Sequence, residues 1–327
     1  MDTVRIGILG AARIAPPAVI KPARNVLEAQ VGAVAARDRS RADAFASKHG
    51  IAQVHETYAD LVSDPEIDAV YNPLPNGLHA QWTIAALEAG KHVLCEKPFT
   101  ANAQEAEAVA AVAERTGLVV MEAFHYRYHP LAHRMREIVE SDELGTIQRI
   151  ETALCFPLPK FSDIRYQYDL AGGATMDVGT YTVHMARLLG REEPEVVSAV
   201  AKLRTPQIDR AMRAELAFPS GHTGRITCSM WSHWVLQTSV HVTGDRGEMR
   251  VINPTAPQVW HRMRVKTSGG TRTERCSRRP TYEYQLEAFC AAVLRGTPPL
   301  TPPADSIANM RVLDAIYVAA GMTPRGT

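Results

Sequence analysis

A lysine and its neighbours are the first residues in this sequence whose types and spacing suggest chemistry. Lys97 lies in the run Glu96-Lys97-Pro98, directly after the apolar run His92–Cys95. If that run is a buried strand of a parallel sheet, Lys97 follows its carboxyl end, where doubly wound folds bind ligands. Pro98 has no amide donor and redirects the chain. The pattern therefore predicts a lysine that is aimed into a binding crevice.

A tyrosine in the second half of the chain is the expected partner of this lysine. Tyr181 comes four residues after Asp177, so the two side chains share one face of an expected helix over 177–189. A free tyrosine has a pKa near ~10, and a neighbouring ammonium lowers that pKa by favouring the phenolate. We expect Tyr181 and Lys97 to take the proton of an alcohol that loses hydride, with Asp177 orienting hydroxyl groups. A tyrosine that only packs the helix is the alternative.

A degenerate glycine turn near the start of the chain predicts a dinucleotide site. The expected strand Val4–Leu9 is followed by a turn that places Gly10, Ala12 and Ala15 in the G-x-G-x-x-G/A frame. The first position requires glycine for the tight turn, and alanine is accepted at the third. We expect Gly10, Ala12, Arg13 and Ile14 to contact the cofactor, with the amides of the following helix facing its diphosphate.

The end of the second expected strand indicates which nicotinamide cofactor is bound. Arg37 lies at the strand tip and Arg41 lies one helical turn further on. Guanidinium groups there would bind the 2′-phosphate of NADP, whereas the carboxylate of Asp38 would accept the ribose hydroxyls of NAD. We expect NADP, and NAD stays possible.

The elements that must position these residues divide the chain into two expected domains. Residues 1–123 alternate between continuous apolar runs and amphipathic helical patterns, which predicts a Rossmann domain with a doubly wound parallel sheet. The expected strands are Val4–Leu9, Val31–Ala35, Ala69–Asn72, His92–Cys95 and Val119–Ala123, and the expected helices are Arg39–His49, Gly77–Ala89 and Ala103–Thr116.

Residues 124–327 have the pattern of an α+β domain for substrate binding and oligomerisation. We expect a large, mainly antiparallel open sheet with helices on one face. The helices are expected at 131–141, 177–189, 282–295 and 305–320, the strands at 147–155, 196–202, 213–218, 223–231, 235–243 and 248–252, and an exposed loop at 267–279. An uncovered apolar sheet face predicts a homodimer or larger homo-oligomer.

Composition excludes several other classes of protein. A net charge of +1 over 327 residues gives no support for nucleic-acid or membrane-surface binding. Five scattered cysteines without a C-x-x-C pair favour reduced thiols over disulfides or a zinc site, and we expect no bound metal. Neither a leader nor an apolar run of about 20 residues is present, so we expect a cytoplasmic protein.

Several of these motifs, taken together, resemble the glucose-fructose oxidoreductase / inositol dehydrogenase (Gfo/Idh/MocA) family over essentially the whole chain. The matching segments are the N-terminal glycine turn, Asn76–His79, Glu96–Pro98, Glu122–Arg127, Gly172–Tyr181 and Leu313–Tyr317. The resemblance implies that Lys97 contacts both substrate and nicotinamide ribose and is essential for catalysis. It also implies a cofactor site that includes Pro75, Asn76, His79, Glu96 and Arg127, with His79 and Arg127 near the nicotinamide.

Many family members carry histidine at the position of Tyr181, so the tyrosine narrows the subgroup. The tyrosine version is similar to glucose-fructose oxidoreductase, mammalian dihydrodiol dehydrogenase and NADP-dependent xylose dehydrogenase. It implies NADP(H)-dependent hydride transfer at a CH–OH group of a sugar, polyol or trans-dihydrodiol. A nicotinamide-dependent glycoside hydrolase and a non-enzymatic NADP-sensing regulator remain alternatives. The substrate, the direction of reaction and the role of His184 stay open.

Overall fold

The chain forms two compact units in the computed structural model, which describes residues 2–231 and 236–326. The first unit combines the residues up to 128 with 280–307, and the second combines 129–279 with the residues from 308 onward. The division expected after residue 123 lies close to the first boundary, but it assigned 280–307 to the second domain. Helix α7 (Thr281–Arg295) shows why, because its Leu286, Phe289 and Cys290 are buried in the core of the first unit.

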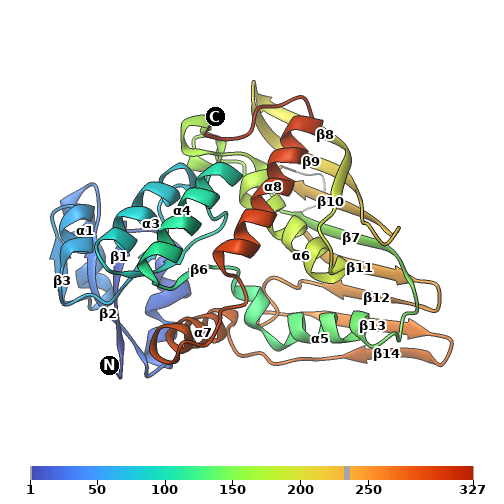
Figure 1. The fold of residues 1–327 in the computed structure, drawn as a ribbon, viewed down its shortest axis with the longest axis horizontal. Helices are drawn as coiled ribbons and strands as arrows, with labels where there is room; N and C mark the ends of the chain where they lie inside the picture. The colour runs from blue at the N-terminus through green and yellow to red at the C-terminus, as the bar shows by residue number, and fades with distance from the viewer. Residues whose placement is uncertain (1, 232–235, 327) are drawn as a thin grey trace. The chain divides into compact units, whose positions relative to one another are not determined.

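A six-stranded parallel sheet forms the centre of the first unit (Figure 1). The strand order β3-β2-β1-β4-β5-β6 places a topological switch point between β1 and β4, the position at which such sheets bind dinucleotides. The strands are β1 (Val4–Leu9), β2 (Ala29–Ala35), β3 (Gln53–His55), β4 (Ala69–Asn72), β5 (His92–Cys95) and β6 (Val120–Glu122). The expected parallel sheet is confirmed, and the short, polar β3 is the strand that the apolar pattern missed.

Two helices of the first unit, α1 and α4, begin and end at residues with clear capping roles. Asp38 caps α1 by accepting from the amide of Arg41, Asn102 caps α4, and Gly50 and Gly117 end these two helices in the left-handed conformation. The helical segments are η1 (Pro16–Ile20), η2 (Pro22–Arg24), α1 (Arg39–His49), α2 (Tyr58–Ser63), η3 (Asn76–Leu78), α3 (His79–Glu88), α4 (Ala103–Thr116), η4 (His125–Tyr128) and α7.

An eight-stranded sheet dominates the second unit, with α5 and α6 on one face (Figure 1). Its order is β14-β13-β12-β11-β7-β10-β9-β8, and every adjacent pair is antiparallel except β7 with β10. The expected α+β architecture is thus confirmed. The strands are β7 (Ile147–Cys155), β8 (Glu195–Thr205), β9 (Ile208–Ala217), β10 (Thr223–Ser229), β11 (Gln237–Gly244), β12 (Gly247–Ile252), β13 (Arg262–Thr267) and β14 (Gly270–Glu274). Residue 235, where one strand was expected to begin, lies outside the described residues.

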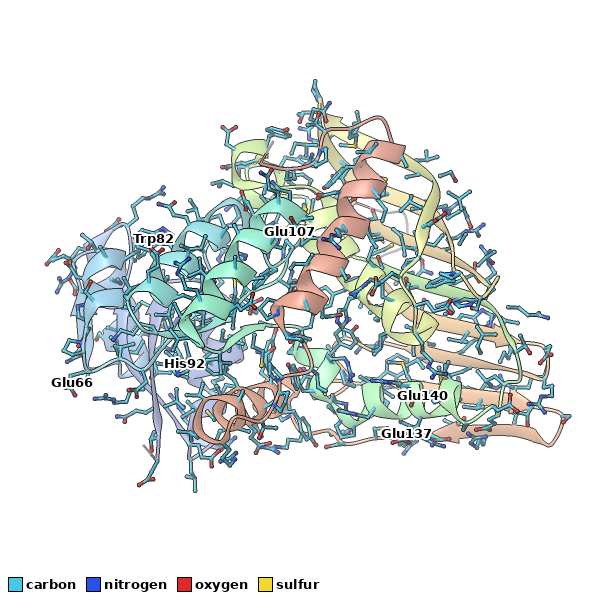
Figure 2. All side chains as sticks on the ribbon, in the orientation of Figure 1. Glu66, Trp82, His92, Glu107, Glu137 and Glu140 are labelled. Carbon is cyan, nitrogen blue, oxygen red and sulfur yellow. The ribbon has the colours of Figure 1, made fainter. Side chains whose placement is uncertain are left out.

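The longer helices of the second unit lie close to the expected ranges, whereas its first two short helical segments were not expected. The helical segments are α5 (Pro130–Glu140), η5 (Ile164–Tyr166), η6 (Tyr168–Leu170), η7 (Thr175–Gly179) and α6 (Thr180–Gly190), and helix α8 (Pro303–Ala319) contains the boundary between the units. In α5, buried Leu131, Met135 and Ile138 form one face, while Glu137 and Glu140 are exposed on the other (Figure 2). This alternation is the 3.6-residue pattern that made the helix predictable.

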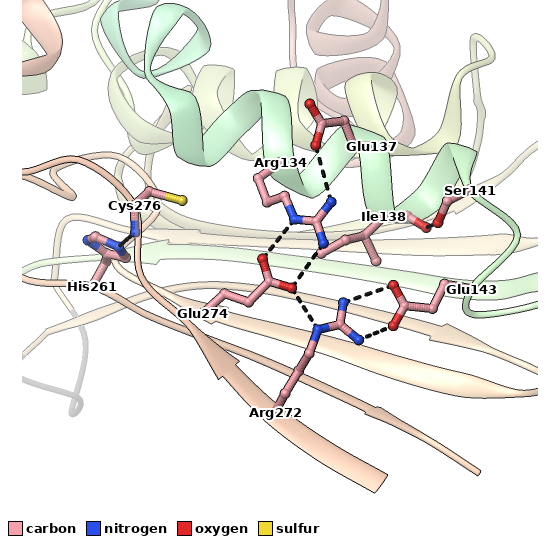
Figure 3. Close-up of polar contacts among 9 residues, drawn as sticks. All are labelled: Arg134, Glu137, Ile138, Ser141, Glu143, His261, Arg272, Glu274 and Cys276. Carbon is pink, nitrogen blue, oxygen red and sulfur yellow. Dashed lines mark hydrogen bonds and ion pairs between the residues drawn. The ribbon is translucent and has the colours of Figure 1, made fainter. Parts of the chain in front are cut away.

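The loop expected over 267–279 is wrong, because β14 forms within it. Arg272 of this strand makes a two-bonded ion pair with Glu143, and Arg134 of α5 donates to Glu274 at 2.7 and 3.0 Å (Figure 3). The guanidinium groups of Arg134 and Arg272 lower the pKa of Glu274 to about 2. A polar sequence forms a strand here because its charges are paired, which an apolar pattern cannot reveal.

The sheet face opposite α6 is charged at its centre rather than apolar. Glu215 accepts from Arg149 at 3.1 Å and from Arg225 at 2.5 Å, and His241 lies 2.9 Å from Glu248. An oligomer was predicted because one face of this sheet was expected to be apolar and uncovered. That expectation is wrong for the middle of the sheet, where the face is charged. Apolar exposure is found on the edge strand β8, where Val197 and Val200 are 64% and 70% exposed.

Candidate active site

The glycine turn expected to hold the cofactor lies at the switch point of the parallel sheet. Gly10 has a φ of +89° and donates its amide to the carbonyl oxygen of Ala35 at 2.6 Å, which ties the ends of β1 and β2 together. A Cβ atom at Gly10 would lie 3.2 Å from Leu74, so both the conformation and the space favour glycine. The turn leads into the short helical segment η1 instead of a long helix, since Pro16 and Pro17 open it and Pro22 follows.

The donor set around this turn fits a phosphorylated dinucleotide. Arg37 and Arg41 are exposed beyond the end of β2, and within the described residues neither belongs to an ion pair. Asp38, by contrast, accepts hydrogen bonds from the hydroxyl of Ser40 at 2.7 Å and the amide of Arg41 at 3.2 Å. These bonds lower the pKa of Asp38 and occupy one of its oxygens in helix capping. The site therefore offers guanidinium groups more readily than a carboxylate, which favours a 2′-phosphate.

The segment that carries Lys97 is held by buried polar contacts at the carboxyl ends of β4 and β5. Tyr71, at the end of β4, donates to Glu96 at 2.6 Å, and both side chains are buried. Asn72 donates to the carbonyl oxygen of His79 and to the hydroxyl of Thr83 at 3.1 and 3.2 Å. The peptide bond between Lys97 and Pro98 is cis. Lys97 thus follows a rigid edge of the sheet, as its sequence position predicts.

His79, which was expected near the nicotinamide, is buried between the turns that follow β4 and β5. Its side chain is 1% exposed, and its Nδ1 and Nε2 atoms lie 2.7 Å from the carbonyl oxygens of Pro98 and Leu74. Burial lowers the pKa of His79 to about 4, against the opposing effect of these two carbonyls. His79 therefore bridges the turn after β4 to the turn that carries Lys97, and its contacts are structural.

Replacement of His79 by leucine should lower both stability and turnover. A neutral imidazole has one N–H, so the substitution removes the donor to one of these two buried carbonyl oxygens, which costs about 1–3 kcal/mol. Thermal unfolding and steady-state kinetics measure the two effects, with His49→Leu on the surface helix α1 as the matched control. A variant with the unfolding temperature and kcat of the unmodified protein would contradict the bridging role.

Arg127 belongs to the buried segment η4, against which helix α7 packs. His125 bonds to the hydroxyl of Thr281 at 2.8 Å, and its ring lies 4.2 Å from that of Tyr282. Tyr128 bonds to the hydroxyl of Thr301 at 2.8 Å. Arg127 itself is 5% exposed. Residues 280–307 belong to the first unit and support η4, the segment whose Arg127 was expected near the nicotinamide.

Asp177 and Tyr181 both lie in the second unit, on consecutive helical segments. Asp177 belongs to the π-helical turn η7 and Tyr181 to the first turn of α6, where its side chain is 7% exposed. Asp177 forms an ion pair with Arg165 at 3.0 Å, and Arg165 also contacts Asp163 at 3.1 Å. The charge of Asp177 raises the pKa of Arg165. Arg165 comes from the irregular segment before the helix and was not expected at the site.

Sequence reasoning missed the residues that support the site but do not take part in its motifs. Tyr71, Asn72 and Arg165 carry no spacing signal of their own. Tyr71 and Asn72 were assigned only to a buried strand, and the sole hint was that polar side chains end an apolar run. Lys97 belongs to the first unit, with the residues expected to bind cofactor, whereas Asp177 and Tyr181 belong to the second.

A dinucleotide-type parallel sheet with a lysine at its carboxyl edge, joined to a separate α+β unit, is an arrangement suited to a nicotinamide-dependent oxidoreductase. Residues 4–124 match the model of an oxidoreductase family with an NAD-binding Rossmann fold, and residues 132–250 match the GFO/IDH/MocA C-terminal domain. The chain therefore belongs to the GFO/IDH/MocA family, as its motifs suggested.

Relatives within this family include sugar and dihydrodiol dehydrogenases. The chain is 40% identical to D-xylose 1-dehydrogenase (NADP(+)) 2 of Haloferax volcanii over 96% of each chain. It is 33% identical to trans-1,2-dihydrobenzene-1,2-diol dehydrogenase of Mus musculus over 70% of this chain and 68% of that one. The expected subgroup is thereby confirmed.

A solved structure of similar fold is the 3-ketoreductase KijD10 from Actinomadura kijaniata in complex with NADP and TDP-benzene. It has a TM-score of 0.90 and 29% identity, covering 97% of this chain and 98% of that one. Variants of this ketoreductase with a replaced lysine or a replaced tyrosine have also been solved. Those two residues have the same separation along their chain as Lys97 and Tyr181.

Within the described ranges, no helix combines the length and apolar character needed to cross a bilayer.

Proposed function

We propose that this protein catalyses NADP(H)-dependent hydride transfer at the CH–OH group of a sugar, a polyol or a trans-dihydrodiol. The observation that carries the proposal is the position of Lys97. It follows β5 at the carboxyl edge of the dinucleotide-type sheet, in a turn fixed by buried contacts of Glu96 and His79. An ammonium at that edge is suited to stabilise an oxygen that gains negative charge during oxidation.

In the proposed reaction Tyr181 receives the hydroxyl proton and Lys97 stabilises both the phenolate and the substrate oxygen. Asp177 accepts hydrogen bonds from neighbouring hydroxyls of the substrate and so orients the substrate. The substrate carbon that carries the hydroxyl loses a hydride and becomes a carbonyl carbon. Oxidised nicotinamide, when bound, supplies the hydride acceptor. Reduction of a carbonyl runs the same proton path in reverse.

The proposed cofactor contacts come from the glycine turn, the end of β2 and the turns after β4 and β5. They comprise Gly10, Ala12, Arg13, Ile14, Arg37, Arg41, Pro75, Asn76, Glu96, Lys97 and Arg127, with His79 supporting the turns from within. The NADP dependence of the xylose dehydrogenase and the NADP bound to the ketoreductase support the choice of cofactor. The matched separation of lysine and tyrosine in the ketoreductase supports the catalytic pair.

Absorbance of NADPH tests the proposal directly, across a panel of pentoses, hexoses, polyols and trans-dihydrodiols. We expect net NADPH formation with at least one class of these substrates. Release of nitrophenol from nitrophenyl sugars without net NADPH would instead identify a glycoside hydrolase. Tight NADP binding with no turnover of any substrate would favour a regulator.

Loss of Arg37 and Arg41 should weaken NADP and leave NAD unaffected. Hydrogen bonds to charged groups contribute about 1.5–3 kcal/mol each, so the double alanine variant should raise KM for NADP by about tenfold or more. The matched control is Arg39→Ala, because Arg39 is held by Asp43 at 2.9 Å and by Glu56. Equal changes in KM for both cofactors would contradict the assignment of the 2′-phosphate site.

We further propose that the open face and edge of the large sheet form a homodimer interface and that the protein works in the cytoplasm. Alternating charges such as Arg149, Glu215 and Arg225, beside exposed Val197 and Val200, could pair with a symmetry-related copy. The five free cysteines support a reducing location. A monomeric mass by light scattering would overturn the dimer.

A further inference from the structure

A buried cluster in the second unit contacts the start of the consecutive segments η7 and α6, which carry Asp177 and Tyr181. We call it the Asp209 cluster, and it consists of Asp209, Thr175, Tyr317 and Arg325, each with a side chain that is 0% exposed. Asp209 comes from the start of β9, Thr175 from the first position of η7, and Tyr317 from α8. Three parts of the chain that are far apart in the sequence, namely η7, β9 and the C-terminal stretch with Tyr317 and Arg325, therefore meet at one carboxylate.

Both oxygens of Asp209 are engaged by donors. Its Oδ2 accepts from the amide and from the hydroxyl of Thr175, each at 2.7 Å. Its Oδ1 accepts from the hydroxyl of Tyr317 and from the guanidinium of Arg325, each at 3.1 Å. A buried carboxylate with this donor set is fixed in one orientation, because any rotation breaks several bonds.

Asp209 supplies a helix cap that the local sequence lacks. The residue before η7 is Ala174, which has no side chain able to accept from the helix amides. The carboxylate of Asp209 accepts from the Thr175 amide instead, and negative charge at a helix N-terminus is favourable. The first turn of the helix that carries Asp177 is thus anchored on a different strand.

Arg325 fixes the turn that precedes this helix. Its Nε donates to the carbonyl oxygen of Gly172 at 2.7 Å, and its guanidinium lies 4.1 Å from the centre of the Tyr317 ring. Gly173, which follows, has a φ of +133°, and a Cβ atom there would lie 2.2 Å from Oδ1 of Asp209. The turn therefore fits against the cluster only as glycine.

The same turn connects the cluster to both partners of the ion pair at the site. The amide of Gly173 donates to the carbonyl oxygen of Arg165 at 2.8 Å, and its own carbonyl oxygen accepts from the amide of Asp177 at 3.0 Å. Asp177 and Arg165 form the ion pair described above. Movement at Gly173 would displace both of them.

We propose that Asp209 and Arg325 are positioning residues for the reaction: they fix the start of the helix so that Asp177 and Tyr181 meet the substrate in one geometry. The expected effect of these two residues on kcat rests on the proposed function. A buried ion pair often stabilises a fold no more than apolar residues of similar volume. The contacts of Asp209 and Arg325 are concentrated on the turn at Gly172 and on the start of η7. We therefore expect this ion pair to fix the geometry of these two segments.

Arg325→Met tests the inference, because methionine keeps much of the volume and removes the donors. Hydrogen–deuterium exchange over residues 172–181 should accelerate about tenfold or more, and kcat should fall by a similar factor, since loss of a charged hydrogen bond corresponds to at least that ratio. KM for NADP should stay within about twofold, because the cofactor contacts belong to the other unit. Arg325→Lys should recover part of both losses, and Lys202→Met on edge strand β8 is the control.

Unchanged exchange over 172–181 and unchanged kcat in folded Arg325→Met would overturn the proposal. If that variant does not fold, Tyr317→Phe removes a single hydroxyl donor to Asp209, and it should change exchange and kcat in the same directions by a smaller factor. An effect of Tyr317→Phe on unfolding temperature alone would contradict a positioning role. Accelerated exchange in a protein whose unmodified form oxidises no sugar, polyol or trans-dihydrodiol would uphold the anchoring of the helix and reject the proposed function.

Discussion

Replacement of Lys97 by methionine should reduce kcat by about 10³-fold or more and leave cofactor binding nearly intact. In the proposed reaction this ammonium stabilises charge on the substrate oxygen and favours the phenolate of Tyr181, and each role alone contributes about 10²–10⁴-fold in comparable enzymes. Methionine retains the unbranched apolar stem, so packing near the buried turn of Glu96 and Pro98 should be conserved. Stopped-flow hydride transfer and equilibrium binding of NADPH by fluorescence measure the two effects separately.

Lys48→Met provides a matched control, because this lysine is exposed in the last turn of α1. It should leave kcat unchanged. Undiminished turnover in Lys97→Met would exclude the lysine from catalysis. A loss confined to KM for NADP would mean that Lys97 only binds cofactor.

Replacement of Tyr181 by phenylalanine should lower kcat by about 10²–10⁴-fold through loss of the proton acceptor. The ring and its packing in α6 are retained, so the unfolding temperature should change little. The pH profile of kcat should lose the limb that reports the phenol, and the primary isotope effect on the remaining rate should show whether hydride transfer has become limiting. Tyr284→Phe on α7 is the control for loss of a tyrosine hydroxyl.

The double variant of Lys97 and Tyr181 distinguishes a cooperating pair from two independent contributions. Groups that act as one unit are strongly non-additive, so the double variant should be about as slow as the slower single variant. Multiplicative losses would indicate that the two residues act separately. Retention of kcat in Tyr181→Phe would assign this tyrosine to packing, the alternative left open by its helical context.

Much of the fold could be predicted from the sequence because the central strands of the first unit are short apolar runs and several helices are amphipathic. β7 begins and ends at the expected residues, and α5 begins and ends one residue earlier than expected. Apolar periodicity reports burial, but it does not report which core a helix joins. Helix α7 therefore went to the wrong unit, and the charged strand β14 appeared as a loop, since its partners in α5 could not be known.

The candidate site was predictable to the extent that its residues belong to motifs. Lys97, Asp177 and Tyr181 stand in short patterns next to expected element ends. Residues that hold them do so over long sequence separations, as Arg325 does for the turn at Gly172. His79 is a similar case. Its motif indicated an important position, but the motif could not show that the imidazole is buried against the carbonyl oxygens of Pro98 and Leu74.

A structure of the complex with NADP and an active sugar would show directly how Lys97 and Tyr181 act. In the proposed reaction the ammonium of Lys97 and the phenol of Tyr181 bind one and the same substrate hydroxyl beside C4 of the nicotinamide. We expect both groups within hydrogen-bond distance of that hydroxyl, about 2.7–3.2 Å. A bound nicotinamide with either group turned away from the substrate, in a complex that is competent for turnover, would contradict it.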